Sequence, residues 1–179
     1  MPSSQSLSLD ERRLVAAWAA DCAERVLHLF EDEAPADGRP RDAIARARAF
    51  AQGELEAAGE IRRRFVAGRA AHAVTSPAAK AAAWSAAQAS GVAHMGAHAL
   101  GAAAYATKAV MIAANATPDA GDAQISWQLD QLSDPARDAL RHLPLLGADN
   151  SGPLGAGLLA SGTLGATIRT IQSALLIRR

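Results

Sequence analysis

Alanine is the feature that most limits what this chain can fold into: it accounts for 46 of the 179 residues, whereas aromatic residues make up only 4%. Alanine has the highest helix propensity and no polar side-chain group, so a chain this rich in alanine is expected to be helical nearly throughout. Its small side chain also lets neighbouring helices pack closely. We therefore predict an all-α fold, a single-domain bundle of six to eight helices formed by residues 1–179.

The first helix has a clear start signal. Ser8 and Glu11 match the S-x-x-E capping box, in which two side chains satisfy backbone N–H groups at the start of a helix. Apolar residues then recur at steps of three and four, which predicts one buried stripe. The stripe consists of Leu14, Trp18, Cys22, Val26 and Leu29. We expect the helix to end near residues 30–33 and residues 1–7 to be flexible.

Proline and glycine mark the boundaries of the later helices. Pro40 and the pair Ser76-Pro77 are typical of helix starts. We expect helices at about residues 40–59, 60–74, 76–90, 91–116, 122–132 and 134–143. In the second of these, Phe65 is expected to be buried. The glycine-rich residues 147–157 predict a loop, because glycine is a poor helix former, and a last helix is expected at about 158–177.

The helix at about 91–116 is expected to lie at the centre of the bundle, because its only fully charged residue is Lys108. Gly96 and Gly101 fall inside it. Each costs roughly 1 kcal/mol relative to alanine in a helix. A neighbouring helix that crosses closely at these two positions would offset that cost.

The charge balance excludes some classes of partner. Lysine and arginine number 18, as do aspartate and glutamate, so the net charge is zero and nucleic-acid binding is not expected. The N-terminus lacks the apolar run of a secretory signal, and the uncharged stretch 154–168 is too short to span a membrane. We expect a cytoplasmic protein. Since a neutral chain is less protected against self-association, a homo-oligomer is plausible.

A first candidate site lies between the first two helices, in the sequence Asp37-Gly38-Arg39-Pro40-Arg41. The arginines lie at a helix start, where the helix dipole disfavours cations, and the acidic residues 31–33 lie at a helix end, where it disfavours anions. One interpretation is that these charges pair with each other. The other is that Asp37, Arg39 and Arg41 bind an acidic partner, for which the planar guanidinium of arginine is well suited.

A second candidate site follows the central helix. His94, His98, Gly101 and Tyr105 recur at steps of four, three and four, and two histidines at this spacing can bind one metal ion. However, the run HMGAH has no glutamate to act as a base. A third ligand would have to come from elsewhere, for example from His72 or Asp21. We therefore favour histidines that form hydrogen bonds or line a groove, and we predict no metal and no cofactor.

The other polar clusters favour structural roles. Asp21 and Glu24 share a helix face and are expected to pair with arginines, because no Glu-x-x-His motif accompanies them. The run 62–64, with Arg69, spreads around a helix and favours a solvated face over a basic patch. Cys22 cannot form an internal disulfide and is expected to be an inert core residue.

Several segments resemble a family of small bacterial helical proteins identified as immunity proteins of polymorphic toxin systems. They are WAADCAERVLHLFE at 18–31, DGRPRDAI at 37–44, ARAFAQGE at 47–54, AAHA at 70–73, AHMGAHALGAAAYATKA at 93–109 and LRHLP at 140–144. The resemblance covers roughly residues 14–145, and the glycine-rich stretch after Leu146 departs from it. It implies a protein that binds and neutralises a cognate toxin without catalysis, and it supplies no active-site residues.

The sequence thus supports one leading hypothesis and two alternatives. The leading one is a cytoplasmic, non-catalytic immunity protein whose partner is a toxin. The first alternative is a helical metal- or small-molecule-binding protein or enzyme that uses a groove at His94, His98 and Tyr105. The second is a self-associating structural protein.

Overall fold

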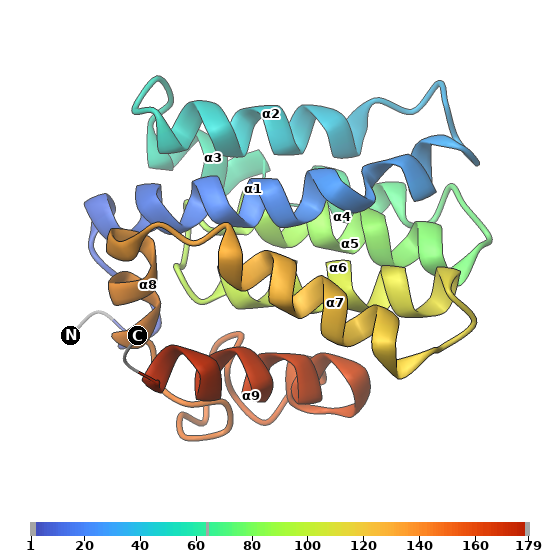
Figure 1. The fold of residues 1–179 in the computed structure, drawn as a ribbon. Coiled ribbons are helices and arrows are strands. Elements are labelled where there is room, and N and C mark those ends of the chain that lie inside the picture. Colours follow the sequence, from blue (N-terminus) through green and yellow to red (C-terminus); the bar gives the residue numbers. More distant parts are fainter. Residues whose placement is uncertain (1–2, 64, 178–179) are drawn as a thin grey trace.

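A computed structural model describes residues 3–63 and 65–177, and it confirms the all-α prediction (Figure 1). Within these residues the chain forms α-helices and one short 3-10 helix and no strand. The helices are α1 (Leu9–Glu31), α2 (Arg39–Ala51), α3 (Ala57–Arg63), α4 (Val66–Ala70), α5 (Pro77–Gly91), α6 (His98–Ala113), α7 (Pro118–Asp130), α8 (Asp134–Arg141), the 3-10 helix η1 (Leu158–Ala160) and α9 (Gly162–Leu176).

Helices α5 and α6 lie in the interior of the bundle. They pack along each other and against α1, while α7 and α9 cover other faces of α6 (Figure 1). Their buried residues are mostly alanines, so the small side chains allow close contact between backbones. Helix α6 is buried along most of its length, as expected for the central helix.

The central helix is shorter than the predicted range 91–116. Residues 92–97 form turns, and the backbone N–H groups of Gly96 and Ala97 donate to the carbonyls of Ser6 and Gln5, at 3.0 and 3.1 Å. These groups are therefore bonded to the N-terminal segment instead of to carbonyls one helical turn back. Helix α6 begins only after this interruption, at His98.

The start of α1 confirms the predicted capping box. The Ser8 hydroxyl accepts from the Glu11 N–H, and the Glu11 carboxylate accepts from the Ser8 N–H at 2.8 Å. Trp18, Cys22 and Val26 are buried as predicted. Leu14 is 39% exposed, because the buried face of α1 runs through Val15 instead.

The segment between α2 and α5 differs from the two helices predicted at 40–59 and 60–74. Helix α2 ends at Ala51, and Gly53 follows in the left-handed region with φ +80°. In place of the helix predicted at 60–74 the chain forms the two short helices α3 and α4. Phe65 lies between them and is 60% exposed, contrary to the expectation that it is buried.

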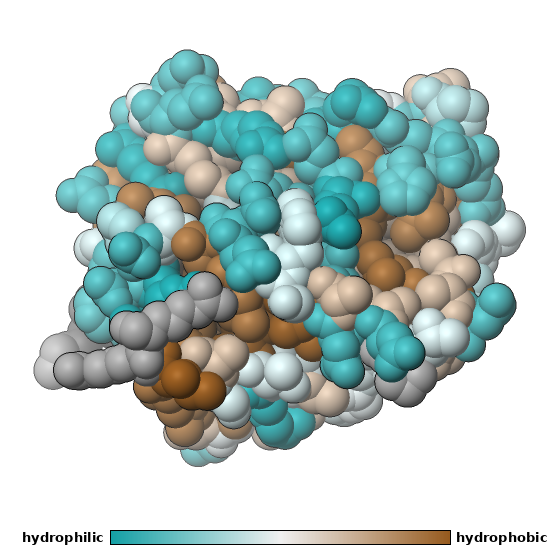
Figure 2. All heavy atoms as spheres, viewed as in Figure 1, coloured by the Kyte–Doolittle hydropathy of each residue, from teal (hydrophilic) through white to brown (hydrophobic). Residues whose placement is uncertain are grey.

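The first and last described segments lie against the bundle. Residues 3–7, where the sequence suggested flexibility, contact the turn before α6 and place the side chain of Gln5 in the interior. Residues 147–157 form turns and bends, and α9 begins at Gly162, later than the predicted 158. Figure 2 shows hydrophobic atoms at the C-terminal end of α9, where Leu176 and Ile177 are more than half exposed.

No helix in the described part of the chain is both long enough and apolar enough to cross a membrane.

Candidate functional site

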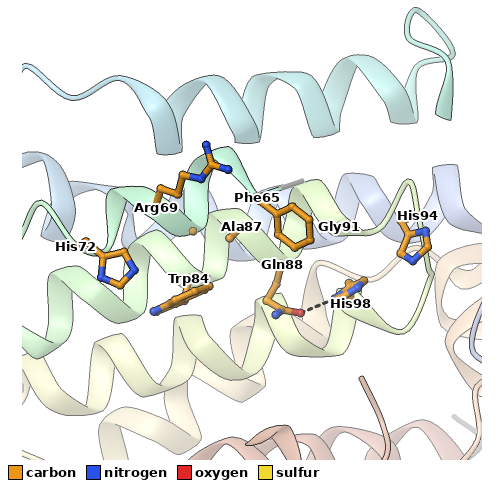
Figure 3. A pocket seen from close by; sticks show the side chains of 10 residues that line it. Phe65, Arg69, His72, Trp84, Ala87, Gln88, Gly91, His94 and His98 are labelled. Atoms are coloured by element: carbon orange, nitrogen blue, oxygen red, sulfur yellow. Dashed lines mark hydrogen bonds between the residues drawn. The ribbon is translucent and has the colours of Figure 1, made fainter. Parts of the chain in front are cut away.

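A groove of about 520 Å³ lies between α4 and the C-terminal half of α5 and extends to the start of α6 (Figure 3). It combines aromatic, imidazole and guanidinium side chains. The lining residues are Phe65, Gly68, Arg69, His72, Trp84, Ala87, Gln88, Gly91, His94 and His98. Its volume is within the range of pockets that bind small molecules or a few side chains of a partner.

One wall of the groove is the indole of Trp84. A Cβ atom at Gly68 would lie 2.9 Å from the Trp84 ring, so the missing side chain lets α4 approach the indole closely. The indole also stacks on Tyr105 of α6, with 6.3 Å between the ring centroids and 28° between the planes. Trp84 is thus held by α4 and α6 while 37% of its surface is exposed.

The other end of the groove is built by α5 and the start of α6. The Nδ1 atom of His98 hydrogen-bonds with Gln88 Oε1 at 2.8 Å, and since that oxygen can only accept, Nδ1 is the donor (Figure 3). The His98 ring lies 3.0 Å from where a Cβ of Gly91 would be. These two contacts fix the orientation of the imidazole.

The groove carries cationic and donor groups but no carboxylate among its lining residues. Arg69 is exposed and makes no salt bridge to a described residue. By contrast, Arg41, Arg46 and Arg48 each pair with an acidic side chain of the chain itself. The guanidinium of Arg69 is therefore available to an anion that enters the groove.

Of the three residues of the predicted histidine groove, the structure places two in the groove and one behind it. His94 and His98 both line it, with ring centroids 6.5 Å apart, although His94 lies in the turn before α6. Tyr105 is buried behind Trp84 and does not line the groove. Burial raises the pKa of the Tyr105 hydroxyl above its ordinary value of 10.0.

The described residues contain no set of ligands that would support the metal hypothesis. His72 lines the same groove as His94 and His98, yet no group of three histidine, cysteine or acidic side chains is placed to hold an ion there or elsewhere in 3–63 and 65–177. Asp21, the other suggested ligand, lies on α1 and pairs with Arg48 at 2.7 Å. Glu24 contacts the same guanidinium, as the sequence suggested for both carboxylates.

The candidate site at Asp37, Arg39 and Arg41 forms pairs within the chain. Arg41 makes a two-bond contact with Glu31, both bonds 2.7 Å, and Arg39 contacts Asp37. Hydrogen bonding to Arg39 lowers the pKa of the Asp37 carboxyl, and hydrogen bonding to Glu31 raises the pKa of Arg41. The Arg41–Glu31 pair matches the interpretation in which the charges at the two helix ends compensate each other, whereas Arg39 pairs with Asp37 of the connection instead of with residues 31–33.

The remaining candidates have structural surroundings. Cys22 is fully buried, and the loss of solvation raises the pKa of its thiol, which disfavours the reactive thiolate. In the basic run, Arg62 and Arg63 are exposed, and Arg63 lies 3.6 Å from Asp42. Arg64 lies outside the described residues.

Sequence reasoning missed the aromatic part of the groove. Trp84 was a single aromatic residue within an alanine-rich helix, and Phe65 was expected in the core. The available signal was the i, i+4 spacing of Trp84 and Gln88, which puts two large side chains on one face of α5.

Comparison with known proteins finds one family. A model of the family described as "Imm-5 like putative immunity protein" matches residues 5–135, which include the whole groove. The glycine-rich segment and α9 lie outside the match. No curated protein and no solved structure matches the chain.

Proposed function

Because the chain belongs to this Imm-5 like family, we propose that it is an immunity protein, which binds a cognate bacterial toxin and neutralises it without catalysing a reaction. The match over residues 5–135 carries the proposal, since it spans α1 to α7 and therefore includes both central helices, α5 and α6. We also propose that the protein acts in the cytoplasm, the compartment expected from its sequence.

Neutralisation by binding requires a surface that keeps its shape when the toxin docks, because ordering a flexible surface reduces affinity. The helical core supports this requirement. Helices α5 and α6 pack along each other through small side chains, and the Ser85 hydroxyl donates to the Ala102 carbonyl at 2.8 Å across that contact. This packing therefore supports fixed positions for the side chains of α5 and α6 before a partner binds.

The proposal is tested in two steps. First, the tagged chain is expressed in its native host, and the proteins that co-purify with it in stoichiometric amounts are identified by mass spectrometry. Second, each candidate toxin is expressed from an inducible promoter with and without the chain. We expect one candidate to stop growth alone and the chain to restore growth, with a direct complex between the two purified proteins.

The contrary result is equally specific. If the host expresses candidate toxins and the chain neither forms a complex with any of them nor restores growth, it is not an immunity protein for those toxins. The growth assay separates neutralisation from simple capture, because a protein that binds without blocking the toxin leaves the cells inhibited.

A further inference from the structure

We propose that the groove between α4 and α5 is the docking site for the toxin, and that it receives a segment in which an apolar side chain is flanked by carboxylates. The inference rests on the proposed function and goes beyond it, because it names the surface and the chemistry of the bound segment. Three features of the groove carry it: exposed aromatic surface, uncompensated positive charge and rigid walls.

The aromatic surface indicates a protein partner. Phe65 is 60% exposed and Trp84 is 37% exposed, which makes them the most exposed of the described aromatic residues, and both line the groove. Aromatic residues and arginine dominate the binding energy of protein interfaces when a partner covers them. Phe65, Trp84 and Arg69 bring these residue types together on one concave surface.

The charge of the groove defines the partner segment. Arg69 makes no salt bridge to a described residue, and the ring N–H groups of His72 and His94 add further donors to a lining without a carboxylate. A cationic, apolar concavity is complementary to carboxylates beside an apolar side chain. Such complementarity selects partners and accelerates their association.

Two walls of the groove are fixed by contacts within the chain. Trp84 is held between Gly68 and Tyr105, and His98 is held by Gln88 and Gly91. A side chain that enters therefore meets walls that do not have to rearrange, which favours affinity. The volume of about 520 Å³ suits one or two inserted side chains, with the rest of the toxin covering the rim.

The two competing surfaces lack this combination. At the α1–α2 connection, Arg39 and Arg41 are already paired with Asp37 and Glu31. At the end of α9, the exposed Leu176 and Ile177 are aliphatic, and they lie outside the segment matched by the family.

The test measures the affinity of variants for the toxin that the growth assay identifies. Arg69→Glu reverses the charge of the groove, and Phe65→Ala removes exposed aromatic surface. Arg169→Glu and Leu158→Ala are matched controls, because they make the same kinds of change at exposed positions on α9 and η1, outside the groove. All four variants are first checked for a wild-type thermal midpoint.

We expect Arg69→Glu to weaken the complex roughly 30-fold or more and Phe65→Ala about 10-fold, in the range of interface hot spots, while both controls remain within about threefold of the wild type. A toxin variant with one interface carboxylate replaced by lysine should bind Arg69→Glu better than the wild-type toxin does. This reciprocal rescue cannot arise from a merely destabilised variant, so it keeps the proposal testable if a groove variant folds poorly.

Two other outcomes overturn the inference and leave the proposed function intact, and a third overturns both. If the groove variants bind the toxin normally while Arg41→Glu weakens the complex, the docking surface is the α1–α2 connection. If the groove variants change the self-association measured by light scattering but not toxin binding, the groove is an interface between copies of the chain. If the wild-type chain binds and neutralises no toxin, the proposed function itself fails.

Discussion

The side chain of Gln5 closes the glycine-rich segment onto the bundle, because its Oε1 atom accepts a hydrogen bond from the backbone N–H of Leu154 at 2.9 Å. Its Nε2 atom donates to the carbonyl of Ser151, and its backbone carbonyl accepts from the N–H of Ala97. The side chain is fully buried. One residue near the N-terminus thus joins two segments that are distant in sequence, the turn before α6 and the turns before η1.

Gln5→Ala should destabilise the fold measurably. It removes two buried side-chain hydrogen bonds and leaves the N–H of Leu154 unsatisfied, so we expect a loss of about 1–3 kcal/mol in the free energy of unfolding. Urea denaturation followed by circular dichroism measures the loss. Ser4→Ala is the control, because the Ser4 hydroxyl makes an exposed bond to Asp149 and should contribute less than about 0.5 kcal/mol. Equal midpoints for Gln5→Ala and the wild type would contradict the prediction.

The parts of the fold that could be predicted from sequence are those controlled by neighbouring residues. The capping box at Ser8 and Glu11 and the helix start at Ser76 depend on atoms within one turn, and both were located correctly. The break before α6 depends instead on carbonyls of Gln5 and Ser6, some 90 residues away. The residue pattern around His94 is that of a continuous helix, and it gives no indication of these distant carbonyl acceptors.

The candidate site, like the fold, could be predicted from the sequence only in part. The sequence paired His94 with His98, and both line one end of the groove, although His94 lies in the turn before α6 and does not share a helix face with His98. The exposure of Trp84 and Phe65 was not predictable, since it depends on how the short helix α4 lies against α5. Alanine-rich faces look alike in sequence, so they do not reveal which neighbour covers them.

Gly101→Ala should be destabilising although alanine is the better helix former. A Cβ atom at Gly101 would lie 2.3 Å from Gln88 Oε1 and 3.2 Å from Leu159 Cδ1, which confirms the close approach expected at this glycine. Overpacking costs about 1–3 kcal/mol, more than the roughly 1 kcal/mol gained in helix propensity. Thermal denaturation measures the net effect.

Gly59→Ala is the matched control for this substitution. Gly59 lies within α3, and nothing is within 4 Å of where its Cβ would be, so alanine should stabilise the protein by up to about 1 kcal/mol. We expect the two substitutions to change the stability of the protein in opposite directions. A stabilising Gly101→Ala would mean that Gln88 and Leu159 move aside at no cost.

The ion pair between the half-buried Arg46 and the buried Glu60 should respond unequally to loss of either partner. The Glu60 residue is 4% exposed, and its Oε2 atom accepts from Arg46 Nε at 3.0 Å. Arg46→Met leaves this carboxylate buried without its cation, at an expected cost of about 3 kcal/mol. Glu60→Gln keeps an acceptor for the guanidinium and should cost about 1 kcal/mol.

A double substitution checks the physical reason for that difference. In Arg46→Met combined with Glu60→Leu no buried charge remains, so most of the stability lost in Arg46→Met should return. Urea denaturation of the wild type, Arg46→Met, Glu60→Leu and the double variant forms a double-mutant cycle. If the double variant is less stable than Arg46→Met, the ion pair is not the origin of the cost.

Glu11 should make the fold sensitive to acid. The backbone N–H of Ser8 and the side chain of His142 both hydrogen-bond to this carboxylate, and together they lower its pKa from 4.5 to about 2. Because the pKa is lower in the folded state, the carboxylate stabilises the fold at pH values above 4.5. That contribution is lost progressively as the pH falls from about 4.5 to about 2.

Glu11→Ala should therefore lower the free energy of unfolding by about 1–2 kcal/mol at neutral pH, a modest value because the carboxylate is partly solvated. At pH 2 the variant and the wild type should differ much less in stability, since about half of the wild-type carboxyl groups are then protonated. Asp10→Ala is the control, because Asp10 lies beside Glu11 in the first turn of α1 and takes no part in the capping box. Urea titrations at pH 7, 4 and 2 measure all three proteins. A Glu11→Ala defect that is as large at pH 2 as at pH 7 would show that the side chain acts through packing and not through its charge.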